Sequence, residues 1–278
     1  MDQIIFNVEM HDKYSSCYDS VHPDIFNSIE QKRISLLIES ILPSGNQSNL
    51  LALDFGCGTG NISSHLVSKH IRTVSADVSA SNLKILSQKL RATTHLITPV
   101  LIDGSTNNQL LHFKFDIIYI YSVLHHIPDY LSVLSFLAKL LKPEGLLIVD
   151  HEASDSSWQT AKDLQNQDYL LADHLLTFSN KICSAASHRK LSSLIIRKFI
   201  NPRFQIDGDI HVWPDDHIKW KDIRSTLISA GMSQIYSNEY LVYKNYYDRK
   251  KYLNIVKVPH YCDMAVAIYK MKSLPTDL

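Results

Sequence analysis

The chain has 278 residues, 45% of them hydrophobic and 20% charged, which is typical of a globular protein with one sizeable core. Lysine plus arginine and aspartate plus glutamate number 28 each, so no net charge favours nucleic acid or an anionic membrane as partner. The four cysteines form no CxxC pair, no run of about 18 apolar residues occurs, and the first residues do not resemble a signal peptide, so we expect a cytoplasmic protein.

Helices and strands are predicted to alternate through the first 150 residues. A helix over 24–42, which Asp24 can cap, precedes a buried strand at 50–54 that ends in a Gly-rich turn. The later predicted elements are a helix at 62–69, a strand at 73–76, a helix capped by Ser79 or Ser81 that runs through 90, strands at 95–102 and 115–121, a helix at 130–141, a turn at 143–145 and a strand at 146–149. This alternation predicts an α/β fold with a doubly wound and mostly parallel sheet.

The alternation stops after residue 152 and returns with a helix at 220–230 and strands at 234–243 and 264–271. We therefore expect a helical insertion after the fifth strand, without a clear strand of its own. The predicted units are an N-terminal helical lid at 1–45, a core at 46–152 and 215–278, and a mostly helical cap over the expected substrate-binding site at 153–214. Tyr14, Tyr18 and Phe26 are candidate lid residues, although a surface helix packed on the sheet is an equal alternative.

Polar residues follow five successive predicted strands, and the carboxyl ends of parallel strands form one rim where ligands bind. Glycines at 56, 58 and 60 let the backbone approach a ligand closely. Asp77 lies 19 residues beyond Gly58, where a carboxylate can accept from both hydroxyls of a ribose, and Asp103 can accept from an exocyclic amine. Together these residues predict a nucleoside site.

The motif spacing resembles class I S-adenosylmethionine-dependent methyltransferases of the small-molecule type rather than dinucleotide enzymes. Asp54 precedes Gly-x-Gly-x-Gly instead of GxGxxG, and the resemblance continues through Asp77, Asp103-Gly104, Phe115-Asp116, Val123-Leu-His-His-Ile-Pro-Asp129 and residues 140–149. It covers 50–150, with weaker matches at 218–243 and 263–271. Pro143-Glu144-Gly145 departs from the usual Pro-Gly-Gly, which puts the local turn geometry in doubt.

The resemblance implies that the seven predicted strands form one Rossmann-like sheet. It also implies S-adenosyl-L-methionine as cofactor, with S-adenosyl-L-homocysteine as product. The glycines would approach its amino-acid part, Asp54 would accept near its ammonium group unless it only stabilises the loop, Asp77 would hold the ribose and Asp103 the adenine amine. The residues expected to contact the cofactor are Asp54, Gly56, Cys57, Gly58, Gly60, Asp77, Val78, Asp103, Gly104, Tyr121 and Ser122.

Candidates for a general base follow the fourth and fifth strands, where an acceptor O–H or N–H would lie. They are His151, Glu152 and His126; a solvated turn at Asp150-His151-Glu152 and a structural role for His125-His126 are the alternatives. These groups could also chelate a divalent metal, as in methyltransferases that act on catechols, but the required spacing is absent and we expect no metal.

The predicted reaction is methyl transfer to an oxygen or nitrogen atom of a small organic metabolite. We expect no nucleic-acid or membrane partner, and a homodimer is left open. One alternative is a non-catalytic S-adenosylmethionine-binding regulatory module. A nicotinamide-dependent dehydrogenase is a further alternative, but it predicts GxGxxG and Tyr-x-x-x-Lys, and neither fits here.

Overall fold

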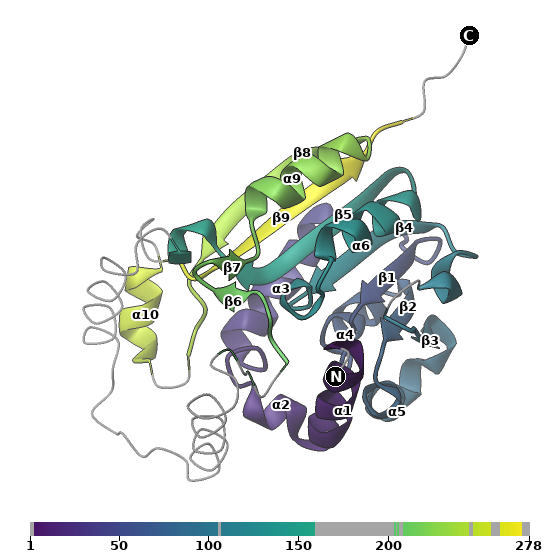
Figure 1. Cartoon of the computed structure of the whole chain (residues 1–278). Coiled ribbons are helices and arrows are strands. Elements are labelled where there is room, and N and C mark those ends of the chain that lie inside the picture. The colour runs from purple at the N-terminus through teal and green to yellow at the C-terminus, as the bar shows by residue number, and fades with distance from the viewer. Residues whose placement is uncertain are drawn as a thin grey trace.

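A computed structural model describes residues 3–104, 107–158, 203, 205, 208–244, 247–256 and 262–273. Its main sheet has seven strands in the order β3-β2-β1-β4-β5-β9-β8 (Figure 1). The first five strands are parallel to one another, and β9 runs antiparallel to both of its neighbours, β5 and β8. The predicted seven-stranded, mostly parallel and Rossmann-like sheet is confirmed.

Most of the predicted strands and helices are present close to their predicted positions, whereas the helix at Arg249–Ile255 was not predicted and the fifth strand is longer than expected. The strands of the main sheet are β1 (Leu51–Phe55), β2 (Arg72–Asp77), β3 (Ile97–Leu101), β4 (Phe115–Tyr121), β5 (Leu141–Ala153), β8 (Met232–Tyr240) and β9 (Met264–Met271). The helices are α1 (Gln3–Tyr14), α2 (Tyr18–Val21), α3 (Ser28–Ile41), α4 (Asn61–Ser68), α5 (Ala80–Lys89), α6 (Tyr130–Lys139), α9 (Trp220–Ser229) and α10 (Arg249–Ile255). None of the helices in the described part of the chain is long and apolar enough to cross a bilayer.

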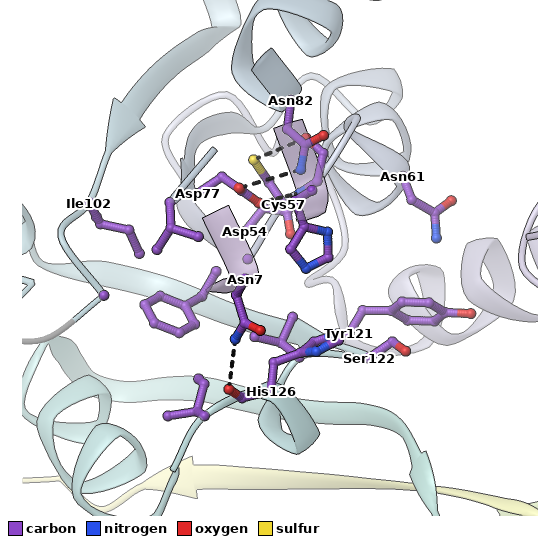
Figure 2. Close-up of a pocket in the computed structure, with 18 of the residues that line it drawn as sticks. Asn7, Asp54, Cys57, Asn61, Asp77, Asn82, Ile102, Tyr121, Ser122 and His126 are labelled. Carbon is purple, nitrogen blue, oxygen red and sulfur yellow. Dashed lines mark hydrogen bonds between the residues drawn. The ribbon is translucent and has the colours of Figure 1, made fainter. Parts of the chain in front are cut away.

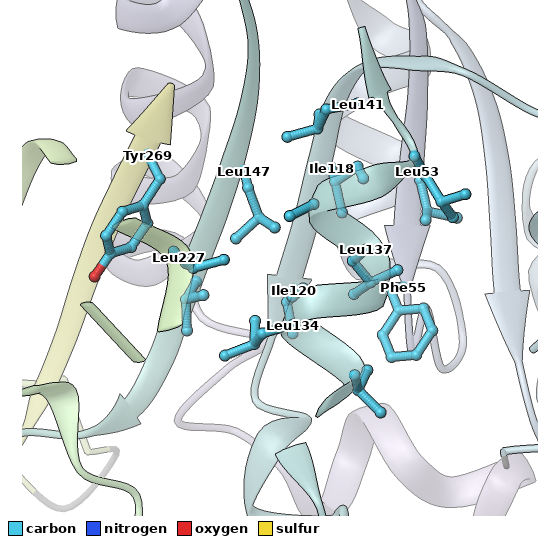
Figure 3. Packing of buried hydrophobic residues seen from close by; sticks show 14 of the residues in the cluster. Leu53, Phe55, Ile118, Ile120, Leu134, Leu137, Leu141, Leu147, Leu227 and Tyr269 are labelled. Atoms are coloured by element: carbon cyan, nitrogen blue, oxygen red, sulfur yellow. The ribbon is translucent and has the colours of Figure 1, made fainter. Parts of the chain in front are cut away.

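Helices cover both faces of the sheet, because alternate side chains of each strand point to opposite faces. On one face, Leu53 and Phe55 of β1 join residues of β4, α6 and α9 in a buried cluster (Figure 3). On the other face, Ala52 of β1 packs with Ile34 of α3 and Leu66 of α4. The polar ends of the strands are therefore the part of the sheet that the core leaves available for a site.

Three local predictions need correction. The helix α3 begins at Ser28 and is capped by Asn27, whose side chain accepts hydrogen bonds from the backbone N–H of Ile29 and Glu30, so Asp24 is not the cap. Residues 143–145 lie within β5 rather than in a separate turn. A short hairpin of β6 (Val212–Trp213) and β7 (Asp216–His217) begins where no strand was expected.

Glu144, where the methyltransferase motif usually has glycine, has a backbone conformation that favours glycine. Glu144 has φ +66°, the left-handed conformation that glycine adopts without cost. Its carboxylate pairs with Lys270 of β9 at 2.5 Å. The glutamate thus occupies a position where glycine is the less strained residue, and a surface ion pair accompanies it.

The N-terminal helices lie against the loops that follow the parallel strands. Asp19 accepts a hydrogen bond of 2.6 Å from Thr59 of the Gly-rich loop, and the Asn7 amide donates to the backbone oxygen of His126 at 3.0 Å. This segment therefore packs on the rim where the site was predicted. Its division at residue 45 stays a prediction, as do the other domain boundaries, and most of the expected cap falls outside the described residues.

Candidate functional site

A first cavity opens at the carboxyl ends of β1, β2 and β4 (Figure 2). Ten of the sequence-predicted site residues line it: Asp54, Gly56, Cys57, Gly58, Asp77, Val78, Gly104, Tyr121, Ser122 and His126. The structure thus brings together residues from four separate strand ends. This is the position at which open α/β sheets hold ligands.

Asp54 is buried at the end of β1 and joins the cavity to the start of α4. One of its oxygens, Oδ2, accepts from the backbone N–H and the hydroxyl of Ser63, at 2.8 and 2.6 Å. Burial raises the pKa of Asp54 to about 7, although the bonds from Ser63 oppose the shift. The residue therefore has a structural role in anchoring α4, whatever it also contributes to a ligand.

Asp77, at the end of β2, holds the Gly-rich loop in place. Its Oδ2 accepts from the backbone N–H of Gly58 and its Oδ1 from that of Ser79, both at 2.8 Å. Burial raises the pKa of the Asp77 carboxyl, and these backbone donors act in the opposite direction. A carboxylate fixed in this way is orientated before any ligand arrives.

The three glycines of the loop differ in what they do. Gly56 has φ +70° and lies so close to Val123 that a Cβ atom would come within 2.5 Å of that side chain. Gly60 precedes α4 with φ +95° and packs on Leu86, and it is not among the residues that line the cavity. A Cβ atom at Gly58 would meet no atom within 4 Å. Gly56 and Gly58 line the cavity and Gly60 does not, so the arrangement supports close approach to a ligand for the first two glycines only.

Asp103 is the predicted cofactor residue that the arrangement supports least. Its side chain is exposed, one carboxylate oxygen accepts from the backbone N–H of Asn107 at 2.9 Å, and it does not line the cavity. Its neighbours Ile102 and Gly104 line the cavity instead. The carboxylate thus accepts from the backbone of the loop that follows β3 instead of lining the cavity.

Sequence reasoning missed three asparagines that line the first cavity. The buried atoms Asn61 Nδ2, Asn82 Oδ1 and Asn107 Oδ1 have no hydrogen-bond partner within the protein. Buried polar atoms are normally paired, so unpaired ones facing a cavity indicate a polar ligand. No sequence motif marks them, since asparagine is common in turns and at helix starts.

A second cavity adjoins the first, and histidines dominate its polar lining. Six line it, namely His11, His22, His125, His126, His151 and His211. The two cavities share His11, Tyr18, Ile25, Ser122 and His126. Of the candidate lid residues, Tyr18 lines both cavities, Phe26 the first and Tyr14 the second. The N-terminal segment therefore contributes a wall to both.

Asp150 belongs to a buried ionic network rather than to a reaction site. Arg33 donates to both of its oxygens, at 3.1 and 2.9 Å, and the hydroxyls of Tyr119 and Tyr240 donate at 2.6 and 2.9 Å. Arg33 also pairs with Glu30 at 2.6 Å. The Asp150 carboxylate is thus fully occupied, and a solvated turn at 150–152 is excluded because all three residues are buried.

Glu152 lines the second cavity, but its oxygens are engaged. Oε1 accepts from the backbone N–H of Val123 and Leu124, at 2.9 and 2.7 Å, and Oε2 lies 2.7 Å from His125 Nδ1. Burial lowers the pKa of His125, but the charge and hydrogen bond of Glu152 outweigh it and raise that pKa to about 9. Because the Glu152 carboxylate already accepts hydrogen bonds from the turn after β4, the arrangement argues against Glu152 as a free base.

His151 is the predicted base whose ring remains available. The side chain is 3% exposed and stacks on Tyr121 with ring centroids 4.7 Å apart, and neither ring nitrogen has a hydrogen-bond partner. Its backbone has φ +63°, at a break in the β5–β9 register between Asp150 and Glu152. A bulge of this kind redirects a side chain, and strained backbone is concentrated at functional sites.

His126 lies between the two cavities. Its Nδ1 is buried without a hydrogen bond, and its ring meets that of His11 edge-on at 5.2 Å. Burial, together with the neighbouring histidines His125 and His11, holds the pKa of His126 well below its usual range. The ring is therefore neutral at physiological pH.

Comparison with known proteins gives consistent matches. Residues 53–147 match the family described as methyltransferase domain. An uncharacterized methyltransferase of Schizosaccharomyces pombe is 32% identical over 132 residues, 43% of this chain and 46% of that protein. A ubiquinone biosynthesis O-methyltransferase of Haemophilus ducreyi is 28% identical over 133 residues, 46% of this chain and 52% of that protein. The chain thus spans about half the length of these curated relatives.

Among solved structures, the magnesium protoporphyrin IX methyltransferase of Synechocystis with bound SAH superposes with a TM-score of 0.57 at 17% identity. The superposition covers 96% of this chain and 100% of that one. At this identity the likeness concerns the fold. The family match over residues 53–147, from β1 to β5, and the order of the strands agree with it, so this part of the chain is similar to a methyltransferase domain and has the Rossmann-like fold.

Proposed function

We propose that the protein is an S-adenosylmethionine-dependent methyltransferase that transfers the methyl group to an oxygen or nitrogen atom of a small organic molecule. The observation that carries this proposal is the pair of adjoining cavities, which share Ser122, His126 and Tyr18. Cofactor and acceptor must meet at one point, and two cavities with a common wall provide it. The acceptor would bind in the second cavity, beside His151.

The residues of the first cavity fit S-adenosylmethionine. Asp77 offers carboxylate oxygens to the ribose hydroxyls, and the unpaired amide atoms of Asn82 and Asn107 offer further polar contacts. Ile102 and Val78 offer apolar contacts to the adenine ring. When bound, the cofactor supplies a methyl group activated by its positive sulfur. The Synechocystis enzyme, which carries the same fold, holds SAH, the demethylated product.

His151 is the residue of this chain that we assign as base. An imidazole nitrogen with no hydrogen-bond partner in the protein can take a proton from an acceptor O–H or N–H bound in the second cavity. Stacking on Tyr121 fixes the ring plane, and Tyr121 itself lines the first cavity. Because Glu152 and Asp150 are already bound by protein donors, we do not give them this role.

The proposal is tested first by calorimetric titration with S-adenosylmethionine, S-adenosylhomocysteine and NAD. We expect the first two to bind and NAD not to bind. Tight NAD binding without S-adenosylmethionine binding would support a dehydrogenase. A mass-spectrometric assay with a panel of phenols, carboxylic acids and amines should then show a methylated product. Cofactor binding with no product from any acceptor would favour the regulatory-module alternative.

A further inference from the structure

The second cavity contains a group of side chains that the proposed function does not use together. His125, His126 and Asp209 each place one ligand atom so that all three atoms lie within 4.8 Å of one another. Asp209 Oδ1 lies 3.7 Å from His125 Nε2 and 3.4 Å from His126 Nδ1. We propose that these three residues bind a divalent transition-metal ion of the zinc class.

The distances from Asp209 Oδ1 to the two histidine nitrogens fit such an ion. Zinc binds nitrogen and oxygen ligands at about 2.1 Å in tetrahedral geometry, which sets neighbouring ligand atoms about 3.4 Å apart. Both measured distances to Asp209 are near this value and longer than an ordinary hydrogen bond. Two imidazoles with a carboxylate favour Zn²⁺ or Co²⁺ over Mg²⁺ and Ca²⁺, which prefer oxygen ligands alone.

Glu152 orientates the His125 ring for metal binding. The 2.7 Å contact between His125 Nδ1 and the buried Glu152 carboxylate places a proton on Nδ1 and directs Nε2 towards Asp209. Metal-binding histidines commonly donate their second nitrogen to a carboxylate in this way. The backbone N–H groups of Val123 and Leu124 donate to Glu152 and fix its position. Through Glu152 they also fix the orientation of the His125 ring.

Asp209 is held against the histidine pair by backbone contacts. The N–H groups of Ile210 and His211 both donate to the backbone oxygen of His125, at 2.9 and 3.2 Å. On the other side of Asp209, the oxygen of Gly208 accepts from Gln3 at 2.9 Å. The sequence could not show this ligand, because more than eighty residues separate Asp209 from the histidines.

A second observation points to a ligand at the same place. His126 Nδ1 is buried and has no hydrogen-bond partner, and in the same cavity both ring nitrogens of His151 also lack one. Three protein ligands leave a coordination position open. All three residues line the second cavity, so that position faces the expected acceptor. This last point rests on the proposed function, whereas binding of the ion does not.

The test uses the full-length chain without an affinity tag, freed of metal with a chelator and titrated with Co²⁺. We expect one equivalent of Co²⁺ to give the visible absorption of a tetrahedral nitrogen–oxygen site and to be displaced by Zn²⁺. The substitution Asp209→Asn should abolish the binding of this one equivalent of Co²⁺. Asp215→Asn is the matched control, because Asp215 lies in the same segment but lines neither cavity.

Glu152→Gln provides the second variant, and thermal unfolding without metal checks that each variant folds. Glutamine can still accept from the backbone, but it donates to His125 Nδ1 and so reverses the favoured tautomer. The Co²⁺ dissociation constant should rise by about 10- to 100-fold. Equal Co²⁺ binding by the wild type, Asp209→Asn and Asp215→Asn would overturn the proposed site. Co²⁺ binding by a protein that shows no methyl transfer would support the proposed metal site and contradict the proposed function.

Discussion

The guanidinium of Arg33 lies against the carboxylate of Asp150 and donates to both of its oxygens, at 3.1 and 2.9 Å. Asp150 is completely buried, and Arg33 also stacks over Tyr240 at 4.0 Å from the ring centroid. This pair ties α3 to β5, whose end lines the second cavity. The network therefore supports the backbone from which His151 projects.

Replacing Arg33 should destabilise the fold strongly. Arg33→Met leaves the Asp150 charge buried without its cation, which typically costs about 3–5 kcal/mol of the free energy of unfolding. Urea denaturation followed by circular dichroism measures the change. Lys142→Met is the control, because Lys142 pairs with Asp116 at a partly exposed position and its loss should cost about 0–1 kcal/mol. Equal effects of the two substitutions would contradict the assignment.

Asp77 should matter for cofactor affinity, whereas Asp103 should not. Asp77→Asn removes a charged acceptor worth about 1.5–3 kcal/mol, so the dissociation constant for S-adenosylmethionine should rise by about 10- to 100-fold. Asp103→Asn, on an exposed side chain outside the cavity, should change it by less than about threefold. Calorimetry measures both constants. The opposite order would restore the role that the sequence resemblance implied for Asp103.

His151→Gln should slow methyl transfer by about 100- to 10,000-fold if the acceptor nucleophile is protonated when it binds. The dissociation constant for S-adenosylmethionine should stay unchanged, since His151 does not line the first cavity. Single-turnover measurement of product separates these effects. His217→Gln is the control, because His217 lies outside both cavities and stacks on Trp158. A normal rate in His151→Gln would show that the ring does not act as base.

Asp54 predicts a specific pH dependence of stability. Its pKa is raised from 3.8 to about 7, so the folded protein keeps a proton that the unfolded chain has lost. The wild type should therefore lose stability relative to Asp54→Asn as the pH rises from about 4 to about 7, and the difference should be constant above that range. Chemical denaturation of both proteins across this range measures it. A difference independent of pH would mean that Asp54 is ionised throughout.

Two substitutions at Glu144 should separate the effect of backbone strain on stability from the effect of the ion pair. Glu144→Gly and Glu144→Ala both remove the Lys270 ion pair, but only glycine relieves the left-handed conformation. The Tm of Glu144→Gly should exceed that of Glu144→Ala by about 2–4 °C. Differential scanning calorimetry provides the comparison. Equal Tm values would show that the strand relaxes around alanine.

The sequence by itself determined the sheet and the general place of the site. Local apolar periodicity predicts the strands and helices of the first 150 residues. Strands that alternate with helices pair in parallel, and parallel strands place their carboxyl ends on one rim. For this reason Gly58, Asp77 and Ser122 could be assigned to one site from the sequence alone. The resemblance to methyltransferases used the same short-range spacings.

Only the tertiary structure decided which polar groups are available for chemistry. Asp150, His151 and Glu152 are consecutive polar residues at the end of one predicted strand. In the structure Arg33 donates to Asp150, and the backbone of the turn after β4 donates to Glu152. A register break in β5 leaves the middle residue with unpaired nitrogens. Hydrogen-bond partners and side-chain directions depend on contacts between distant segments, and for that physical reason spacing along the chain could not separate these three residues.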